Sequence, residues 1–293
     1  MSLELAPALT LNDGTDIPQL GLGTWALRGE ECVATIRSAI EVGYRHFDTA
    51  ARYGNEEAVG QAINEAIAAG DVSRDELFIT SKVWNDHHDA QATAESFQKS
   101  LAKLGLDYLD LFLVHWPYPQ QQKYVECFEA IARLQGLGTV QSIGVANFYE
   151  DVLDDLITQT GIVPAVNQVE LHPGFSQSTL REYHDAHGII TEAWSPLGRG
   201  ILLQNPVIAD VADQVGRSPA QVILRWGIQL GCITIPKSAK LDRLKENLNI
   251  FDFQLSEEQM DRINILDGQR GFGRIFDDPH TWPDSLYRKE SQS

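Results

Sequence analysis

Residues 43–56 read GYRHFDTAARYGNE, and this stretch decides the fold that the sequence predicts. The run Tyr44–Phe47 is typical of a short buried strand, which would end at Asp48. The residues that follow predict a loop that carries Tyr53. A carboxylate and a phenol would therefore lie close together at the end of one strand.

Two later strands are also followed by a titratable side chain. Lys82 comes after the predicted strand 77–81, and His115 comes after the predicted strand 108–114. The separations from Asp48 to Lys82 and from Lys82 to His115 are 34 and 33 residues, which is close to one strand–helix unit each. Equal spacing predicts equivalent ends of successive parallel strands. In a closed barrel of such units these ends face one mouth, where active sites lie.

The same alternation of strands and helices continues outward from this stretch. Apolar residues recur at helical spacing after each predicted strand, as at Val33, Ile36 and Ile40, and Gly43 is typical of a helix end. Ahead of the repeats, Asp13–Gly14 predicts the turn of a hairpin. The predicted strands of the repeating part are residues 20–23, 44–47, 77–81, 108–114, 142–145, 165–170, 189–194 and 231–235.

The second half of the chain adds three features to this pattern. Between Leu197 and Ser218 the alternation of strand and helix patterns is less regular, which predicts an insertion after the seventh strand. Ser218 with the following proline predicts the start of the seventh helix, and Ser256 predicts the capped start of an extra helix. From Asp267 the composition is typical of an ordered tail across the body. We therefore expect one domain over residues 1–293, an α/β protein with a (β/α)8 TIM barrel, an N-terminal β-hairpin and extra helices outside the barrel.

The charge balance and the cysteines limit the possible classes of protein. A formal net charge of −18 argues against nucleic acid or an anionic membrane as the partner. No run of about 18 apolar residues occurs and no signal segment opens the sequence, so a cytoplasmic protein is expected. The three cysteines are widely spaced and are expected to be reduced thiols in the core: Cys32, Cys127 and Cys232.

Asp48, Tyr53, Lys82 and His115 together suggest the transfer of a proton to a carbonyl oxygen. A tyrosine with its ordinary pKa of about 10 is a poor acid at neutral pH. A lysine ammonium beside the phenol favours the phenolate, and a carboxylate can hold that lysine in place. His115 would orient a substrate oxygen through a hydrogen bond. The alternative is that each residue is separately structural, for instance as an Asp–Lys ion pair under a loop.

Three tryptophans would line the same mouth. Trp25, Trp84 and Trp116 each follow a predicted strand end within a few residues. Together they predict an aromatic pocket that accepts apolar or flat substrates, although each one alone could equally be core packing.

A cofactor site is predicted after the eighth strand. No GxGxxG fingerprint opens a strand-to-helix turn, so a Rossmann site is not supported. Barrels often bind phosphate at the ends of strands seven and eight, where the N–H groups of a helix start also attract anions. A basic cluster lies at this point of an acidic chain, and it predicts a site for the phosphate of a large cofactor, unless it is only a solvated helix face. Its members are Lys237, Lys240, Arg243 and Lys245, of which Arg243 can form a planar fork on a phosphate and stack on an adenine.

Eight motifs, in order along the chain, resemble those of the aldo-keto reductases. The sequence is most similar to the bacterial branch that includes the 2,5-diketo-D-gluconate reductases, partly because Trp194 stands where many animal members have tyrosine. The motifs are GLGTW at 21–25, GYRHFDTAARYGNE at 43–56, SKVW at 81–84, LDLFLVHWP at 109–117, SIGVANF at 142–148, NQVELHP at 167–173, WSPLGRG at 194–200 and IPKSAKLDRLKEN at 235–247.

The resemblance implies a barrel that reduces aldehydes and ketones to alcohols with NADPH bound in extended form, and a monomer. It implies that Tyr53 is the general acid, with Lys82, Asp48 and His115 in the roles given above. By the same resemblance, the nicotinamide end of the cofactor would contact Asn147 and Gln168 through its carboxamide and stack on Trp194, and further cofactor contacts are implied for Gly23, Thr24, Trp25 and Asp48. The pyrophosphate would lie along Ser195, Leu197 and Gly198, the 2′-phosphate at Lys237, Ser238 and Arg243, and the adenine at Glu246 and Asn247. Substrate contacts are implied for Trp25, Tyr53, Trp84, His115 and Trp116, and no metal is implied.

The chain departs from the family pattern at Ala146, where the family usually has serine before the asparagine. One hydrogen bond to the carboxamide is then missing, which is worth about 0.5–1.5 kcal/mol. Looser anchoring of the nicotinamide is expected, and not loss of activity. Arg199 and Lys240 also replace residues that are commonly small or hydroxylic, and a basic side chain there could add to phosphate binding.

Two other functions stay open on the sequence alone. One is a cofactor-sensing subunit that resembles the reductase-like β-subunits of potassium channels. The other is a metal-dependent barrel hydrolase, which is disfavoured because neither the pair at 87–88 nor the pair His184 and His187 has a third ligand at a recognisable spacing. Substrate choice would reside in the loops 116–122 and 197–206 and in the tail 271–282. Keto-sugars, dicarbonyls and aromatic aldehydes are all compatible with these loops.

Overall fold

The computed structural model describes residues 5–281, so Trp282 at the end of the predicted tail lies outside the described residues. Eight parallel strands form one sheet in which every strand pairs with its neighbour in sequence. Leu20 pairs with Thr234, and the Gly21 N–H donates to the Thr234 carbonyl at 2.9 Å, which closes the sheet into a barrel. The strands are β3 (Leu22–Gly23), β4 (His46–Asp48), β5 (Phe78–Val83), β6 (Leu109–Val114), β7 (Val140–Ala146), β8 (Val166–Glu170), β9 (Ile190–Trp194) and β10 (Ile233–Thr234).

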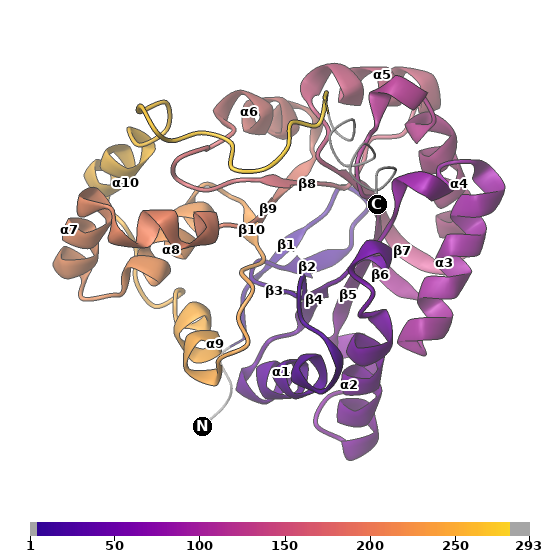
Figure 1. Ribbon diagram of the computed structural model, residues 1–293, viewed down its shortest axis with the longest axis horizontal. Coiled ribbons are helices and arrows are strands. Elements are labelled where there is room, and N and C mark those ends of the chain that lie inside the picture. Colours follow the sequence, from indigo (N-terminus) through magenta and orange to yellow (C-terminus); the bar gives the residue numbers. More distant parts are fainter. Residues whose placement is uncertain (1–4, 282–293) are drawn as a thin grey trace, which may run out of the picture.

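Helices surround the strands in Figure 1 and cover the outer face of the barrel. In the first of them, Val33, Ile36 and Ile40 are buried, as their helical spacing predicts. Parallel strands need a crossover between them, which is why a helix follows almost every strand. The helices are α1 (Gly29–Val42), α2 (Glu56–Ala69), α3 (Ala90–Leu104), α4 (Tyr124–Gly136), α5 (Glu150–Thr160), α6 (Ser178–His187), α7 (Pro206–Val215), α8 (Pro219–Gln229), α9 (Leu241–Leu248) and α10 (Glu257–Asn264).

The predicted (β/α)8 barrel with its hairpin is confirmed. The hairpin pairs β1 (Ala8–Thr10) with β2 (Asp16–Pro18). Its Ile17 is fully buried in one apolar cluster with Phe78 and Ile233 of the barrel strands. The hairpin therefore packs against the amino-terminal ends of the strands, which leaves their carboxyl-terminal ends to form the mouth.

Two details of the prediction are wrong. Lys82 does not follow a strand, because β5 continues to Val83 and contains it. The region between Leu197 and Ser218 is also more regular than expected, since it holds the helix α7 after a short 3-10 segment. Asn205 accepts a hydrogen bond from the Val207 N–H and so caps α7, a start signal that was present in the sequence.

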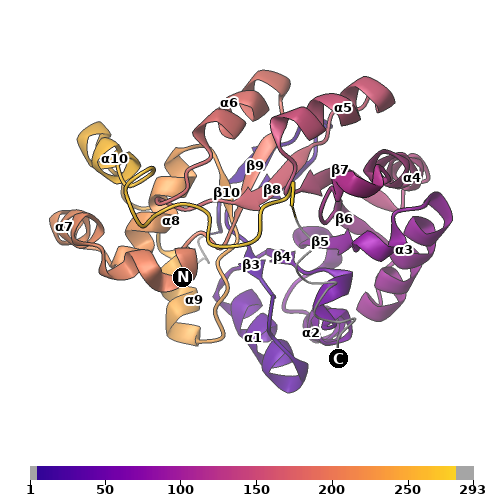
Figure 2. The ribbon, with the colours of Figure 1, turned by 45° about the horizontal axis from the view of Figure 1, so that its top comes forward.

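The segment after α10 crosses the mouth instead of joining the outer ring of helices. Figure 2 shows it passing over the strands near β8 and β9, in yellow. Asp267 fastens its beginning by accepting a hydrogen bond from the Ser176 N–H at 3.0 Å. The ordered tail that the composition predicts is confirmed up to residue 281. No helix within residues 5–281 combines the length and the hydrophobicity that a membrane crossing requires.

Candidate active site

An ion pair between Asp48 and Lys82 lies at the base of the mouth. Both side chains are buried, and the Lys82 Nζ is 2.7 Å from each carboxylate oxygen of Asp48. The third ammonium hydrogen reaches the Thr49 carbonyl at 3.0 Å. Burial lowers the pKa of Lys82 most strongly of any single cause, but the neighbouring groups, Asp48 first among them, together raise it more, so the net shift is upward. Lys82 is therefore an ammonium at neutral pH, as predicted.

Tyr53 lies directly beside this pair, in a short 3-10 turn after β4. The Lys82 Nζ is 5.1 Å from the centroid of its ring. Burial raises the pKa of Tyr53, while the Lys82 ammonium lowers it and offsets part of that effect. Lys82 thus acts in the predicted direction, but burial outweighs it. The phenol keeps its proton at neutral pH, and it is a proton donor that needs the ammonium to limit the rise in its pKa.

His115 follows β6 and completes the group. Its ring meets the Tyr53 ring edge-on at 5.7 Å and the Trp84 ring at 5.0 Å. Burial lowers the pKa of His115 well below its ordinary value, and the Lys82 ammonium adds to the effect. The imidazole is neutral at pH 7, so it can donate a single hydrogen bond to an oxygen in the mouth.

The tryptophans divide into an inner and an outer set. Trp84 packs against His115, while Trp25 is 54% exposed at the rim. Trp116 is partly buried. Across the rim, the Arg199 guanidinium lies 5.7 Å from the Trp25 ring centroid. Of the tryptophans predicted to line a pocket, Trp84 thus lies beside His115 and Trp25 lies at the exposed rim.

Asn147, Gln168 and Trp194 stand together on the wall opposite Tyr53. The Trp194 indole N–H donates to the Asn147 side-chain oxygen at 3.0 Å, and the Asn147 amide donates to the His115 carbonyl at 2.9 Å. Asn147 has a φ of 66°, a left-handed conformation that asparagine tolerates. The Gln168 amide donates to Asp48 at 2.8 Å. Ala146 is fully buried beside Gln168 in register, without a polar side chain to offer.

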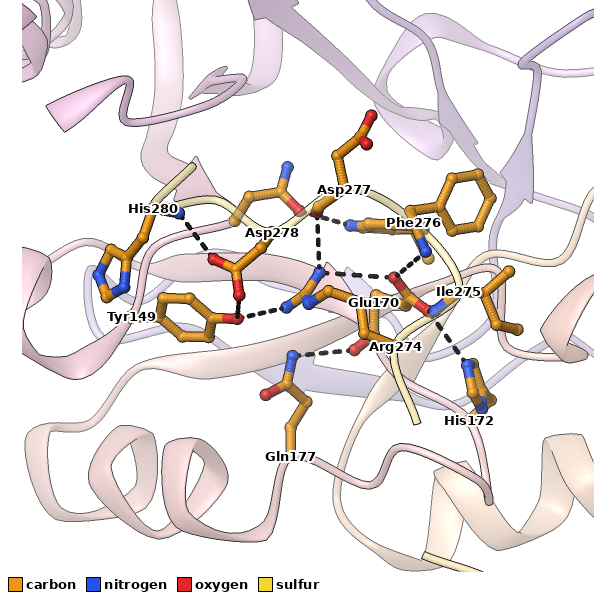
Figure 3. Close-up of polar contacts among 12 residues, drawn as sticks. Tyr149, Glu170, His172, Gln177, Arg274, Ile275, Phe276, Asp277, Asp278 and His280 are labelled. Atoms are coloured by element: carbon orange, nitrogen blue, oxygen red, sulfur yellow. Dashed lines mark hydrogen bonds and ion pairs between the residues drawn. The ribbon is translucent and has the colours of Figure 1, made fainter. Parts of the chain in front are cut away.

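The predicted tail forms a further wall, and its anchor on Glu170 was not predicted from the sequence. Figure 3 shows Glu170, at the end of β8, receiving donors from the tail. This buried carboxylate accepts hydrogen bonds from the backbone N–H groups of Ile275 at 2.6 Å and Phe276 at 3.2 Å, and Arg274 lies 3.4 Å away. The Phe276 ring then meets the Trp194 ring at 4.7 Å. An acidic residue at the fully buried end of β8 was the available signal.

The predicted phosphate end of the cofactor site lies at the start of α9. Lys237, Lys240 and Arg243 are exposed there, and the N-cap residue Lys240 offers no side-chain cap to the helix. The Ser238 side chain instead accepts a hydrogen bond from the Lys240 N–H at 3.2 Å. Glu246 is half-buried and Asn247 buried farther along the helix. Basic side chains thus lie at a helix start that no side chain caps, with Asp242 in its first turn, and the phosphate site stays a prediction.

The remaining predicted cofactor residues lie at the strand ends and in the loop after β9. Gly23 allows a close approach, because a Cβ there would lie 2.9 Å from the Ile235 carbonyl oxygen. The Thr24 hydroxyl donates to the Asp48 carbonyl at 2.9 Å. In the loop after β9, Ser195 and Gly198 have positive φ and Leu197 is half-buried.

The histidine pairs do not come together as ligands. His184 is buried between Asn167 and Thr191, whereas His187 is exposed and stacks on Tyr183 at 4.0 Å. Within residues 5–281, no group of three or more His, Cys, Asp or Glu side chains is arranged to hold a metal ion.

Comparison with known proteins places the chain in a family. The model of the aldo/keto reductase family matches residues 19–267. An aldo-keto reductase of Mycolicibacterium smegmatis is 48% identical over 95% of this chain and 98% of its own, and the methylglyoxal reductase DkgA of Escherichia coli O157:H7 is 46% identical over 90% and 95%. The crystal structure of a Bombyx mori aldo-keto reductase in complex with NADP superposes with a TM-score of 0.87, at 38% identity over 94% of this chain and 96% of that one. The chain belongs to the aldo/keto reductase family.

Proposed function

We propose that the protein reduces aldehydes and ketones to alcohols with NADPH, and that Tyr53 supplies the proton. The observation that carries the proposal is the buried contact of Lys82 with both oxygens of Asp48 at 2.7 Å, beside a tyrosine that keeps its proton. A neutral histidine in edge contact with that tyrosine supports it. This arrangement suits a carbonyl that becomes negatively charged at oxygen during reduction.

Each residue has a defined part in the proposed mechanism. NADPH, when bound, supplies the hydride that adds to the carbonyl carbon. The Tyr53 hydroxyl donates its proton to the carbonyl oxygen, and the Lys82 ammonium stabilises the phenolate that is left. Asp48 holds the ammonium in place, and His115 orients the oxygen by donating a hydrogen bond. Tyr53 regains a proton from solvent through the mouth, at which it is partly exposed.

The residues present fit the proposed cofactor at both of its ends. The exposed cations Lys237, Lys240 and Arg243 lie beside the uncapped N-terminus of α9, where a phosphate is favoured. At the other end, Asn147 and Gln168 would hold the carboxamide and Trp194 would contact the nicotinamide ring. The Bombyx mori relative was solved in complex with NADP, which agrees with this reading.

Tyr53→Phe tests the proposed acid. Loss of a general acid typically costs about 10²- to 10⁴-fold in rate, so kcat for aldehyde reduction should fall by that range while the KM for NADPH stays nearly unchanged. Tyr183→Phe, which removes a surface hydroxyl on α6, is the matched control. Wild-type turnover in the Tyr53 variant would reject the assignment.

The first substrates to test are small dicarbonyls, because one relative at 46% identity is named a methylglyoxal reductase. Keto-sugars and aromatic aldehydes complete the panel, each with NADPH and with NADH. The expected form of the protein is a monomer in the cytoplasm, which size-exclusion chromatography and fractionation of cells would check.

A further inference from the structure

A second carboxylic acid lies under the proposed catalytic group, and the sequence analysis did not single it out. Glu192 of β9 is fully buried in the barrel interior. The Gln168 amide nitrogen is 2.7 Å from Glu192 Oε2 and 2.8 Å from Asp48 Oδ2. One amide thus donates one hydrogen to each of two carboxyl groups. With both hydrogens used, Gln168 can contact a ligand only through its oxygen, as an acceptor.

His46 determines how many protons this group holds. Its Nδ1 is 3.3 Å from the Pro18 carbonyl oxygen, which only accepts hydrogen bonds, so Nδ1 carries the hydrogen. In the neutral ring Nε2 is then an acceptor; it faces Glu192 Oε1 at 3.5 Å and the Thr80 hydroxyl, also at 3.5 Å. Oε1 has no hydrogen-bond partner elsewhere in the described part of the chain. Two facing acceptors repel each other unless one proton lies between them.

The surroundings decide which side holds that proton. The charged and titratable groups that face Glu192 are His46 and Asp48 from β4 and Lys82 from β5, with Tyr53 above them. Asp48 and Lys82 already balance each other, so an ionised Glu192 would add an uncompensated negative charge. Burial and the neighbouring Asp48 raise the pKa of Glu192 to about 8, while burial lowers the pKa of His46 to about 3. Both shifts favour a neutral acid beside a neutral imidazole.

We infer that Glu192 is a neutral carboxylic acid at pH 7 and is the positioning residue of Gln168. Its Oε1 holds the proton toward His46, and its Oε2 accepts one amide hydrogen of Gln168 while Asp48 accepts the other. The Gln168 oxygen is thereby directed to the nicotinamide carboxamide. This step rests on the proposed function, whereas the protonation state of Glu192 does not depend on it.

Two substitutions of Glu192 separate the effect of its hydrogen-bonding shape from the effect of its charge. Glu192→Gln reproduces the neutral acid, because its amide group can donate to His46 and its oxygen can accept from Gln168. Glu192→Leu removes both contacts, so that Gln168 keeps only Asp48 as an acceptor for its amide hydrogens and His46 Nε2 keeps only the Thr80 hydroxyl, at 3.5 Å. Loss of one anchored hydrogen bond corresponds to about 2- to 12-fold in affinity, so the NADPH Kd of the Leu variant should rise by that range and the Gln variant should restore it. Titration of NADPH fluorescence at pH 7 measures the Kd without turnover.

The pH dependence provides the second readout. Above about pH 8 Glu192 loses the proton that lies toward His46, and the repulsion between the two facing acceptors displaces its carboxylate, so the wild-type NADPH Kd should rise while the Kd of Glu192→Gln should not. Weakened binding in the Gln variant at pH 7, equal to that in the Leu variant, would overturn the neutral acid. Wild-type affinity in the Leu variant would overturn the positioning of Gln168.

The same variants distinguish this inference from the proposed function. The wild type must first bind NADPH and reduce a carbonyl, and failure there rejects the proposed function alone. The protonation state of Glu192 is then obtained from the pH dependence of the protein's stability to urea. A raised pKa means that the folded state binds more protons, so the wild-type urea midpoint should fall relative to Glu192→Gln as the pH rises from 5 to 8. Parallel midpoints over this interval would reject the neutral acid.

Discussion

The hydrogen bonds between Glu170 and the tail determine how strongly the tail is held across the mouth of the barrel. Two backbone N–H groups, from Ile275 and Phe276, donate to this buried carboxylate at 2.6 and 3.2 Å (Figure 3). Hydrogen bonds to a charged group contribute about 1.5–3 kcal/mol, compared with about 0.5–1.5 kcal/mol for neutral partners. Glu170→Gln keeps the size but removes the charge and replaces one of the two accepting oxygens by an NH2 donor, so we expect the docking of the tail to weaken by at least about 2–3 kcal/mol in total.

Amide hydrogen exchange measures this change directly. A loss of about 2–3 kcal/mol corresponds to a roughly 30- to 150-fold increase in the opening of the tail. The amides of Ile275 and Phe276 should therefore exchange faster by at least that factor, while the amides of the barrel strands stay unchanged. Asp277→Asn, an exposed carboxylate in the same segment, is the matched control. Unchanged exchange at both amides in the Glu170 variant would refute the reasoning, since the tail would then be held by other contacts.

Three further outcomes are expected. Arg243→Ala should raise the KM for NADPH about 10- to 150-fold and leave the KM for NADH within twofold, because it removes a charge-assisted contact to the 2′-phosphate. Lys99→Ala on α3 is the control. Equal changes of KM for both cofactors would reject the contact. The three cysteines are buried and burial raises their pKa values to about 11 or 12, so a thiol reagent should label none in the folded protein and three in urea. Burial lowers the pKa of His184 to about 3, below the ordinary 6.5, so the unfolded chain binds more protons between these values. Unfolding free energy should fall by up to about 1.4 kcal/mol per pH unit below 6.5, and His184→Gln should reduce this slope in urea titrations; an unchanged slope would contradict the assignment.

Much of the barrel could be predicted from the sequence because its signals are local. Helical spacing of apolar residues, glycine at helix ends and the Asp13–Gly14 turn each act within a few residues. Ser218 caps its helix as expected, and the predicted capped start at Ser256 formed with Gln259. Equal spacing along parallel strands also predicted correctly that Asp48 and Lys82 meet, since strands β4 and β5 pair in register. The exact end of β5 was not predicted, because strand ends depend on pairing with β6.

The partners of the buried carboxylates could not be predicted in this way. Glu170 is satisfied by Ile275 and Phe276, more than 100 residues away, and Glu192 shares an amide with Asp48 across the barrel. No periodicity in the chain encodes which side chains meet inside a closed barrel. The same holds for Tyr53, whose pKa depends on burial more than on Lys82. The sequence alone determined the barrel and the residues at its mouth, because hydrophobic pattern and spacing are local properties. Only the tertiary structure decided their protonation and the position of the tail, because desolvation and distant partners arise when the chain is folded.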